Sequence, residues 1–189
     1  MRVIGWCAPM SIHEIVLSET KPETEWVRGR ALQKVSPTFR HARVQSCFVT
    51  ALSAYAGDRG RAGTEWRFRV APPGEVRRPL VPDVAYVSME RLRSVPREEI
   101  ECPTFPPDVA VEILSPDEDP RDVADKVDVY LRAGVRLVIE LGTRTRTARL
   151  HDGARPVQLG EDDVLRHAIL PGFELALRPF FSEALDLPL

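Results

Sequence analysis

Two acidic residues, Asp83 and Glu112, stand in segments that are otherwise apolar. Asp83 follows Pro82 and begins the run DVAYV, and Glu112 lies inside PDVAVEIL. A carboxylate among apolar neighbours is costly to bury unless a partner neutralises it, and two on neighbouring strands repel unless a cation lies between them. Mg²⁺ and Mn²⁺ prefer such oxygen ligands, completed by water and phosphate oxygens. The pair therefore predicts a divalent-cation site. The alternative is that Asp83 caps a turn and Glu112 pairs with an arginine.

Lysine is rare in this chain, which has 23 arginines but lysine only at Lys21, Lys34 and Lys126. Genome composition is a sufficient explanation for such a bias. The rarity of lysine nevertheless makes each lysine worth considering as a functional residue. At about 100° per residue, Lys126 lies at the edge of a buried helical stripe that includes Tyr130. It is thereby able to reach the preceding strand. The alternative is an exposed pair with Asp122, worth roughly 0.3–0.5 kcal/mol.

Other catalytic motifs are absent from the sequence. There is no phosphate-binding glycine loop of the GxGxxG or GxxxxGK[ST] type, and no GxSxG nucleophile motif. The four histidines do not show HxH, HxxxH or HExxH spacing, so each is expected to be an ordinary surface or partly buried residue. They are His13, His41, His151 and His167.

Composition limits the class of protein. A length of 189 residues with 43% hydrophobic residues suits one domain with a sizeable core. A net charge of -2 argues against a strongly cationic protein that coats nucleic acid, although a local basic groove remains compatible. Three scattered cysteines fit a reducing cytosol, and no signal peptide or apolar run of about 18 residues is present. A cytoplasmic protein without a membrane segment is expected.

The elements that must position these residues follow from periodicity. Apolar residues at helical spacing predict a helix over 41–56 that ends at Gly57. Pro120, capped by Asp119, begins a second helix that Gly134 closes. Strands at 108–114 and 136–141 flank it, which indicates a βαβ unit. The remaining predictions are a helix over 11–19, a hairpin over 25–35 around Gly29, strands over 65–70, 83–87 and 145–152, a surface loop over 94–107 and an apolar closing segment.

Three stretches carry a resemblance: PDVAYVSMERL (82–92), PDVAVEILSPDEDPRDVADKVDVYLRAGV (107–135) and DVLRHAILPGFELAL (163–177). Together they resemble the Uma-two family of restriction endonucleases, in the PD-(D/E)xK nuclease superfamily. The segment EWVRGRALQKVSPTFRHARV (25–44) is similar to the N-terminal part of that family. The resemblance implies an α/β, restriction-endonuclease-like core, a mixed β-sheet flanked by helices, with an N-terminal helix and hairpin extension.

The resemblance also assigns roles to individual residues. Asp83 matches the superfamily aspartate and Glu112 the second acid, and both are implied ligands of Mg²⁺ or Mn²⁺. The superfamily usually places a lysine two residues after that acid, where this chain has Leu114. The family pattern moves this lysine to the following helix, at Lys126. Glu25 matches an N-terminal acidic position and is implied to be an outer or weak metal ligand.

Other positions match less directly. Asp108, Asp122 and Tyr130 fit the family pattern, and we interpret Asp108 as a strand-entry residue and Asp122 as a helix-start residue. The segment LVIELG (137–142) departs from it, because its acid, Glu140, is out of place and an aromatic residue is missing. That departure leaves the end of this strand without an expected role.

The implied function is metal-assisted hydrolysis of phosphodiester bonds, most directly in DNA. One domain over 1–189 is expected, with an N-terminal extension (1–40), a nuclease core (about 41–152) and a closing segment (153–189). Two alternatives stay open: an inactive nucleic-acid-binding or assembly module, and a hydrolase of RNA or small phosphoesters. A homodimer is expected, with the apolar segment 1–10 either in the interface or on the core of its own chain. Lys126→Met is expected to reduce Mg²⁺-dependent cleavage by orders of magnitude while barely changing the melting temperature.

Overall fold

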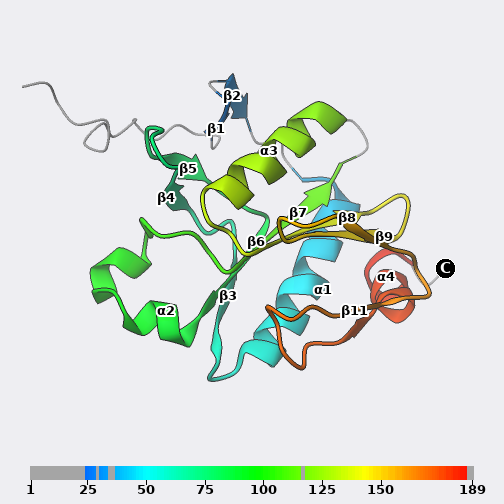
Figure 1. Ribbon diagram of the computed structural model, residues 1–189. Helices are drawn as coiled ribbons and strands as arrows, with labels where there is room; N and C mark the ends of the chain where they lie inside the picture. The colour runs from blue at the N-terminus through cyan, green and yellow to red at the C-terminus, as the bar shows by residue number, and fades with distance from the viewer. Residues whose placement is uncertain (1–23, 29, 34–36, 116–117, 187–189) are drawn as a thin grey trace, which may run out of the picture.

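A six-stranded mixed sheet forms the centre of the protein in the computed structural model, which describes residues 24–28, 30–33, 37–115 and 118–186 (Figure 1). Its spatial order is β10-β9-β8-β7-β6-β3. Only the β7–β8 pair is parallel within this sheet, and the other neighbours are antiparallel. The strands are β3 (Gly60–Thr64), β6 (Val84–Ser88), β7 (Val109–Leu114), β8 (Leu137–Gly142), β9 (Thr147–His151) and β10 (Val157–Leu159).

The parallel pair is joined by helix α3 (Pro120–Arg132), which confirms the predicted βαβ unit. The Asp119 side chain accepts a hydrogen bond from Arg121 N, and Pro120 fits the first turn because that position needs no intrahelical N–H bond. After the helix, Gly134 has φ of +98°, a conformation that L side chains rarely adopt. Local chemistry thus determines where α3 begins and where the chain turns back into β8.

Helices cover both faces of the sheet (Figure 1). Helices α1 (Phe39–Ala56) and α4 (Leu177–Leu185) pack on one face, where Phe48 is fully buried and contacts Phe173 and Phe180 edge to face. Helix α3 covers part of the other face through Val127 and Tyr130. Because both faces are covered, β7 and β8 are almost entirely buried, as their near-continuous apolar sequences predict.

A hairpin of β1 (Thr24–Val27) and β2 (Arg30–Gln33) lies beside α3, which confirms the hairpin predicted over 25–35 (Figure 1). Arg28 forms ion pairs with Asp125 and Asp128, and Arg30 forms ion pairs with Asp122 and Asp125. Both arginine side chains are about half exposed, so each pair contributes little alone, on the order of 0–1 kcal/mol. Together they align the hairpin along the helix.

The strand predicted over 65–70 is confirmed for 68–70 and is wrong for 65–67. Strand β3 ends at Thr64, Glu65 has φ of +50°, and a separate strand β4 (Phe68–Val70) pairs with β5 (Arg78–Leu80). The indole N–H of Trp66 donates to the carbonyl of Ile100, which holds the turn. The alternation of apolar and polar residues therefore predicts the buried side chains correctly only for residues 68–70. The backbone changes direction at Glu65, so the pattern does not extend across the whole segment.

Several short elements complete the fold. The predicted loop over 94–107 contains the 3₁₀ helix η2 (Arg97–Ile100), preceded by α2 (Met89–Arg93). The closing segment folds as β11 (Val164–Leu165), β12 (Leu175–Ala176) and α4. The helix predicted over 11–19 and the apolar segment 1–10 lie outside the described residues. Within the described ranges, no helix is both long and apolar enough to cross a membrane.

Candidate active site

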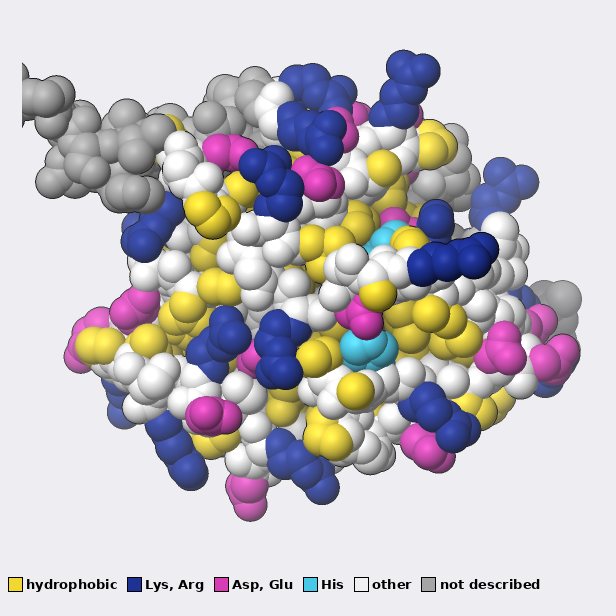
Figure 2. All heavy atoms as spheres, viewed as in Figure 1, with side chains coloured by type: hydrophobic (Ala, Val, Ile, Leu, Met, Phe, Trp, Pro, Cys, Tyr) yellow, Lys and Arg dark blue, Asp and Glu magenta, His cyan; other side chains and the backbone are white. Residues whose placement is uncertain are grey.

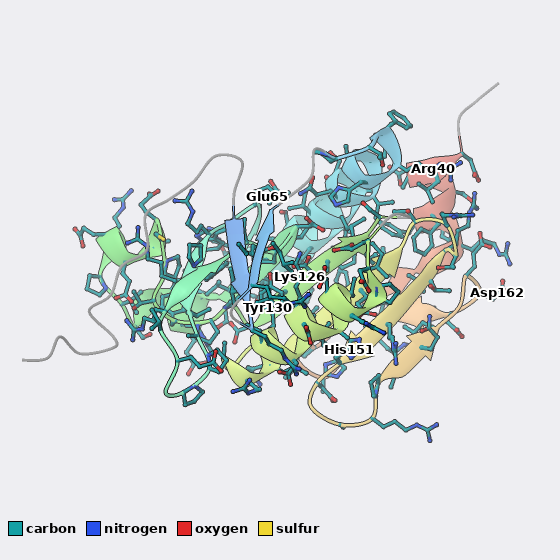
Figure 3. The ribbon with its side chains drawn as sticks, turned by 90° about the horizontal axis from the view of Figure 1, so that it is seen from above. Arg40, Glu65, Lys126, Tyr130, His151 and Asp162 are labelled. Atoms are coloured by element: carbon teal, nitrogen blue, oxygen red, sulfur yellow. The ribbon has the colours of Figure 1, made fainter. Side chains whose placement is uncertain are left out.

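Lys126 lies between two carboxylates under helix α3. Its Nζ is 2.9 Å from Oε2 of Glu112 on β7 and 3.0 Å from Oε2 of Glu25 on β1. The three residues are buried, with exposed fractions of 7% for Lys126, 4% for Glu112 and 1% for Glu25. Figure 3 shows Lys126 next to the β1–β2 hairpin. The fold thus gathers one cation and two acids from a helix and two different sheets.

The ionisation of Lys126 follows from these neighbours. Burial lowers the pKa of a lysine, but the attraction of Glu112 and Glu25 outweighs burial and raises the pKa of Lys126 well above its usual value. Lys126 therefore carries a full charge at neutral pH. The alternative pairing with Asp122 is not formed, because Asp122 Oδ1 lies 2.8 Å from Arg30 NH2.

Tyr130 holds the same glutamate from the next turn of α3. Its hydroxyl donates to Oε1 of Glu112 at 2.8 Å and lies 3.5 Å from Oε1 of Glu25. Burial raises the pKa of Tyr130 well above its usual value, and the charges of Glu112 and Glu25 raise it further. Tyr130 therefore stays a neutral donor. The four-residue spacing from Lys126 is the sequence signal for this role, since both side chains share one helix face.

Glu25 is anchored to the chain that leads to Asp83. Its Oε1 accepts a hydrogen bond from Val81 N at 2.8 Å, while its Oε2 contacts Lys126. The carboxylate thus ties β1 both to α3 and to the segment before β6. Its position beside the lysine is what the structure establishes, and its role as an outer metal ligand stays a prediction.

Asp83 lies at the start of β6, beside the end of β7 that carries Glu112. Its Oδ2 accepts a hydrogen bond from Ile113 N at 2.7 Å and lies 3.2 Å from Nε2 of His41 on α1. Asp83 therefore binds the backbone of β7 next to Glu112. The contact with His41 was not expected, because no local pattern reports a pairing across 42 residues.

Asp108 has a structural position at the other end of β7. Its Oδ2 accepts a hydrogen bond from Ser88 N at 2.8 Å, and its Oδ1 lies 3.3 Å from Arg91 NH2. This geometry agrees with the interpretation of Asp108 as a strand-entry residue. Asp108 is buried like Glu112, but it precedes β7 and therefore stands apart from the glutamate.

The residues present fit a divalent cation that is held by two carboxylates and completed by water and substrate oxygens. Asp83 and Glu112 offer oxygen ligands from adjacent strands, which suits Mg²⁺ or Mn²⁺. Among the described residues, no group of three or more His, Cys, Asp or Glu side chains is arranged to hold a metal ion. Mg²⁺ is commonly bound through one or two carboxylates, with water and substrate phosphate oxygens as the other ligands. Asp83 and Glu112 fit such a site.

Comparison with known proteins places the chain in a family. Residues 11–178 match the model of the Uma2 family, described as "Putative restriction endonuclease". The chain belongs to the Uma2 family. The matched residues of this Uma2 protein include Asp83, Glu112 and Lys126. The family description supports a nuclease activity. No curated protein matches the chain.

The Uma2 fold is also found in a solved structure. A crystal structure from Anabaena variabilis ATCC 29413, described as a "putative nuclease belonging to DUF820", superposes with a TM-score of 0.77. The two sequences are 23% identical, and the match covers 89% of this chain and 95% of that chain. The similarity confirms the predicted α/β fold, a central mixed sheet flanked by helices.

Proposed function

We propose that this protein is a metal-dependent endonuclease that hydrolyses phosphodiester bonds in DNA. The observation that carries the proposal is the distance of 2.9 Å between Lys126 Nζ and Glu112 Oε2. The superfamily lysine usually stands two residues after the acid on the strand, where this chain has Leu114. Here Lys126, a buried lysine of helix α3, reaches Glu112 instead. Membership of the Uma2 family supports the nuclease class, and the convergence of Asp83 on the same strand end supports a metal-assisted reaction.

The roles of the residues follow from their contacts. Asp83 and Glu112 would hold Mg²⁺, which polarises the phosphate and lowers the pKa of a bound water when it is present. Lys126 supplies a fixed positive charge beside Glu112, where it would stabilise charge that develops on the phosphate. Tyr130 fixes the orientation of the Glu112 carboxylate through its 2.8 Å hydrogen bond. Such preorganised groups are effective because little reorganisation is needed during the reaction.

DNA is the proposed substrate because the nuclease superfamily that the sequence resembles acts mostly on DNA. Figure 2 shows Lys and Arg side chains spread around the visible face instead of gathered in one continuous patch. The net charge of -2 agrees with this distribution. Binding would therefore depend on local phosphate contacts and would weaken steeply with salt.

Conversion of supercoiled plasmid to nicked and linear forms, with Mg²⁺ or Mn²⁺ and with EDTA, tests the proposal. Cation-dependent cleavage that Glu112→Gln abolishes is expected. Glu75→Gln is a matched control, because it is the same chemical change and the ion pair of Glu75 with Arg132 is half exposed. Cleavage by Glu112→Gln at the native rate would exclude the assigned site.

A parallel panel separates the alternatives. Single-stranded RNA and small phosphate diesters, offered under the same conditions, test for a hydrolase of another class of phosphoester. Binding of DNA without cleavage of any substrate would indicate an inactive binding module. The expected homodimer also belongs to the proposal, and light scattering at micromolar concentration distinguishes it from a monomer of 21.2 kDa.

A further inference from the structure

A cavity of about 570 Å³ lies on the side of α3 that faces β8 and β9. Pockets of roughly 300–1,000 Å³ suit small ligands. The rim includes Pro120, Ala124 and Arg149, which are exposed, so the cavity reaches the surface. Its apolar wall consists of Leu114 at the end of β7 and of Val123, Val127 and Leu131 on α3.

The polar floor of this cavity is the continuation of the candidate active site across the sheet. Glu112 is in register with Glu140 on β8, and Glu140 is in register with Arg149 on β9. Neighbouring strands lie about 4.8 Å apart, and residues in register share one face of the sheet. The cavity therefore begins one strand away from Glu112. Glu140, which has no expected role from the sequence, is part of its lining.

Glu140 and His151 are buried groups that the proposed nuclease site does not use. Their exposed fractions are 7% and 8%, and His151 Nε2 lies 3.2 Å from Glu140 Oε1. The geometry of that contact is not a hydrogen bond, and His151 Nε2 has no hydrogen-bond partner among the described residues. A buried polar atom without a partner is unfavourable, so a ligand that bonds to it would be stabilised. Figure 3 shows His151 apart from Lys126 and Tyr130.

We propose that this cavity binds one unpaired nucleobase that carries an exocyclic amino group, next to the scissile phosphate. The inference rests on the proposed nuclease function for the identity of its ligand. A base has apolar faces and a polar edge, which match the aliphatic wall from α3 and the polar floor from β8 and β9. Proteins that hold an unstacked base use apolar side chains against its faces and hydrogen bonds at its edge. Glutamate accepts hydrogen bonds from amino groups such as N4 of cytosine.

Charge selects a base over a phosphate for this cavity. Glu118, Asp128 and Glu140 line it, with Arg149 as the permanent cation in the lining. Asp128 also pairs with Arg28 and Arg132, so the excess of carboxylates comes from Glu118 and Glu140. An anion would be repelled by this excess of carboxylates, whereas an amino group donates to them. The phosphate of the same nucleotide would stay outside, toward Lys126. The base and the phosphate of one nucleotide would thus occupy neighbouring sites, the cavity and the Glu112–Lys126 pair.

Nuclear magnetic resonance of the ¹⁵N-labelled full chain in EDTA tests the inference without any cleavage. The probes are deoxycytidine, deoxyadenosine and deoxyuridine. Deoxycytidine and deoxyuridine have the same ring and sugar, and they differ in the amino or oxo group at C4 and in the proton that the oxo form carries at N3. We expect the imidazole signals of His151 to shift with deoxycytidine or deoxyadenosine, and deoxyuridine to bind at least tenfold more weakly. Glu140→Gln should remove this preference, because its amide can also donate to the oxo group.

A variant that fills the cavity with a larger side chain provides a second test. Ala124→Phe places a ring at the exposed rim and should abolish nucleoside binding, whereas Ala54→Phe, the same change at an exposed position of α1 on the opposite face of the sheet, should not. Heteronuclear spectra of both variants report whether the fold is kept. Equal binding of deoxyuridine, no shift with any probe, or unchanged binding in Ala124→Phe would each overturn the inference.

Lys126→Met separates this inference from the proposed function. The variant should keep nucleoside binding while it loses cleavage. Native protein that cleaves DNA but shows no nucleoside-induced shift at His151 would overturn the base site and leave the nuclease intact. Nucleoside binding that Ala124→Phe abolishes, in a protein that cleaves none of the substrates tested, would uphold the base site and remove the nuclease assignment.

Discussion

Lys126 Nζ lies 2.9 Å from Glu112 Oε2 although the two residues belong to different elements and stand 14 positions apart. A lysine two residues after Glu112 would share its strand and its face. The helix supplies the lysine instead, and Leu114 occupies the strand position. The crossover from β7 to α3 makes this possible, because it returns the chain over the strand that it has just left.

Lys126→Met should reduce metal-dependent cleavage by at least a hundredfold. It should also destabilise the fold, contrary to the expectation from the sequence that the melting temperature barely changes. Removal of the ammonium leaves Glu112 and Glu25 buried without their shared cation, and breaking a buried pair costs about 3–5 kcal/mol. Denaturant unfolding monitored by circular dichroism measures the loss.

A double variant separates the two effects of this change. Lys126→Met with Glu25→Gln removes one of the two carboxylates that would lose the cation. It should recover part of the stability without any cleavage activity. Recovery of cleavage together with stability would show that Lys126 acts through folding alone.

Tyr130→Phe should lower stability by roughly 1–3 kcal/mol, because Oε1 of Glu112 loses a buried hydrogen bond from the hydroxyl. Cleavage should fall mainly through kcat, since the variant changes the orientation of Glu112 and not the surface that binds DNA. Tyr55→Phe is a matched control, because the hydroxyl of Tyr55 donates to Pro171 O, far from Glu112 in the chain. An equal decrease of kcat in both variants would contradict a positioning role for Tyr130.

Alkaline pH should destabilise the native protein. The pKa values of Lys126 and Tyr130 are raised in the fold above ordinary values of 10.5 and 10.0. The unfolded chain therefore releases these protons first, so their contribution is complete below about pH 10 and is lost as the pH rises further. Burial also raises the pKa values of Tyr55 and Tyr86, so the difference between native protein and Tyr130→Phe isolates one group. A smaller decline in stability above pH 10 is expected for Tyr130→Phe, and parallel curves would contradict it.

Binding of Mn²⁺ should depend on Glu112. Titration calorimetry of native protein and Glu112→Gln should show at least tenfold weaker binding in the variant, because one of two carboxylate ligands is lost. Asp108→Asn is the matched control, since Asp108 is a buried acid that precedes β7, at the opposite end from Glu112. Equal affinity in native protein and Glu112→Gln would remove Glu112 from the site. Glu25→Gln should have a smaller effect than Glu112→Gln if Glu25 is an outer ligand.

Local sequence was sufficient for the elements that carry the site. The cap at Asp119, the proline at 120 and the apolar spacing up to Tyr130 determine α3, and the run that contains Glu112 determines β7. These features act between residues within about four positions of each other, which is why they can be recognised without a structure. The same spacing indicated that the ammonium of Lys126 would point along the sheet surface and not straight into solvent.

Only the tertiary structure decided which residues meet across longer separations. The contacts of Glu25 with Lys126 and of His41 with Asp83 depend on how the hairpin and α1 pack against the sheet. The cavity at Glu140 depends on strand register, because the alignment of β8 with β9 brings the carboxylate beside His151. Alternation along one strand shows which face a side chain takes, but the neighbour on that face is determined by the pairing of strands and the packing of helices.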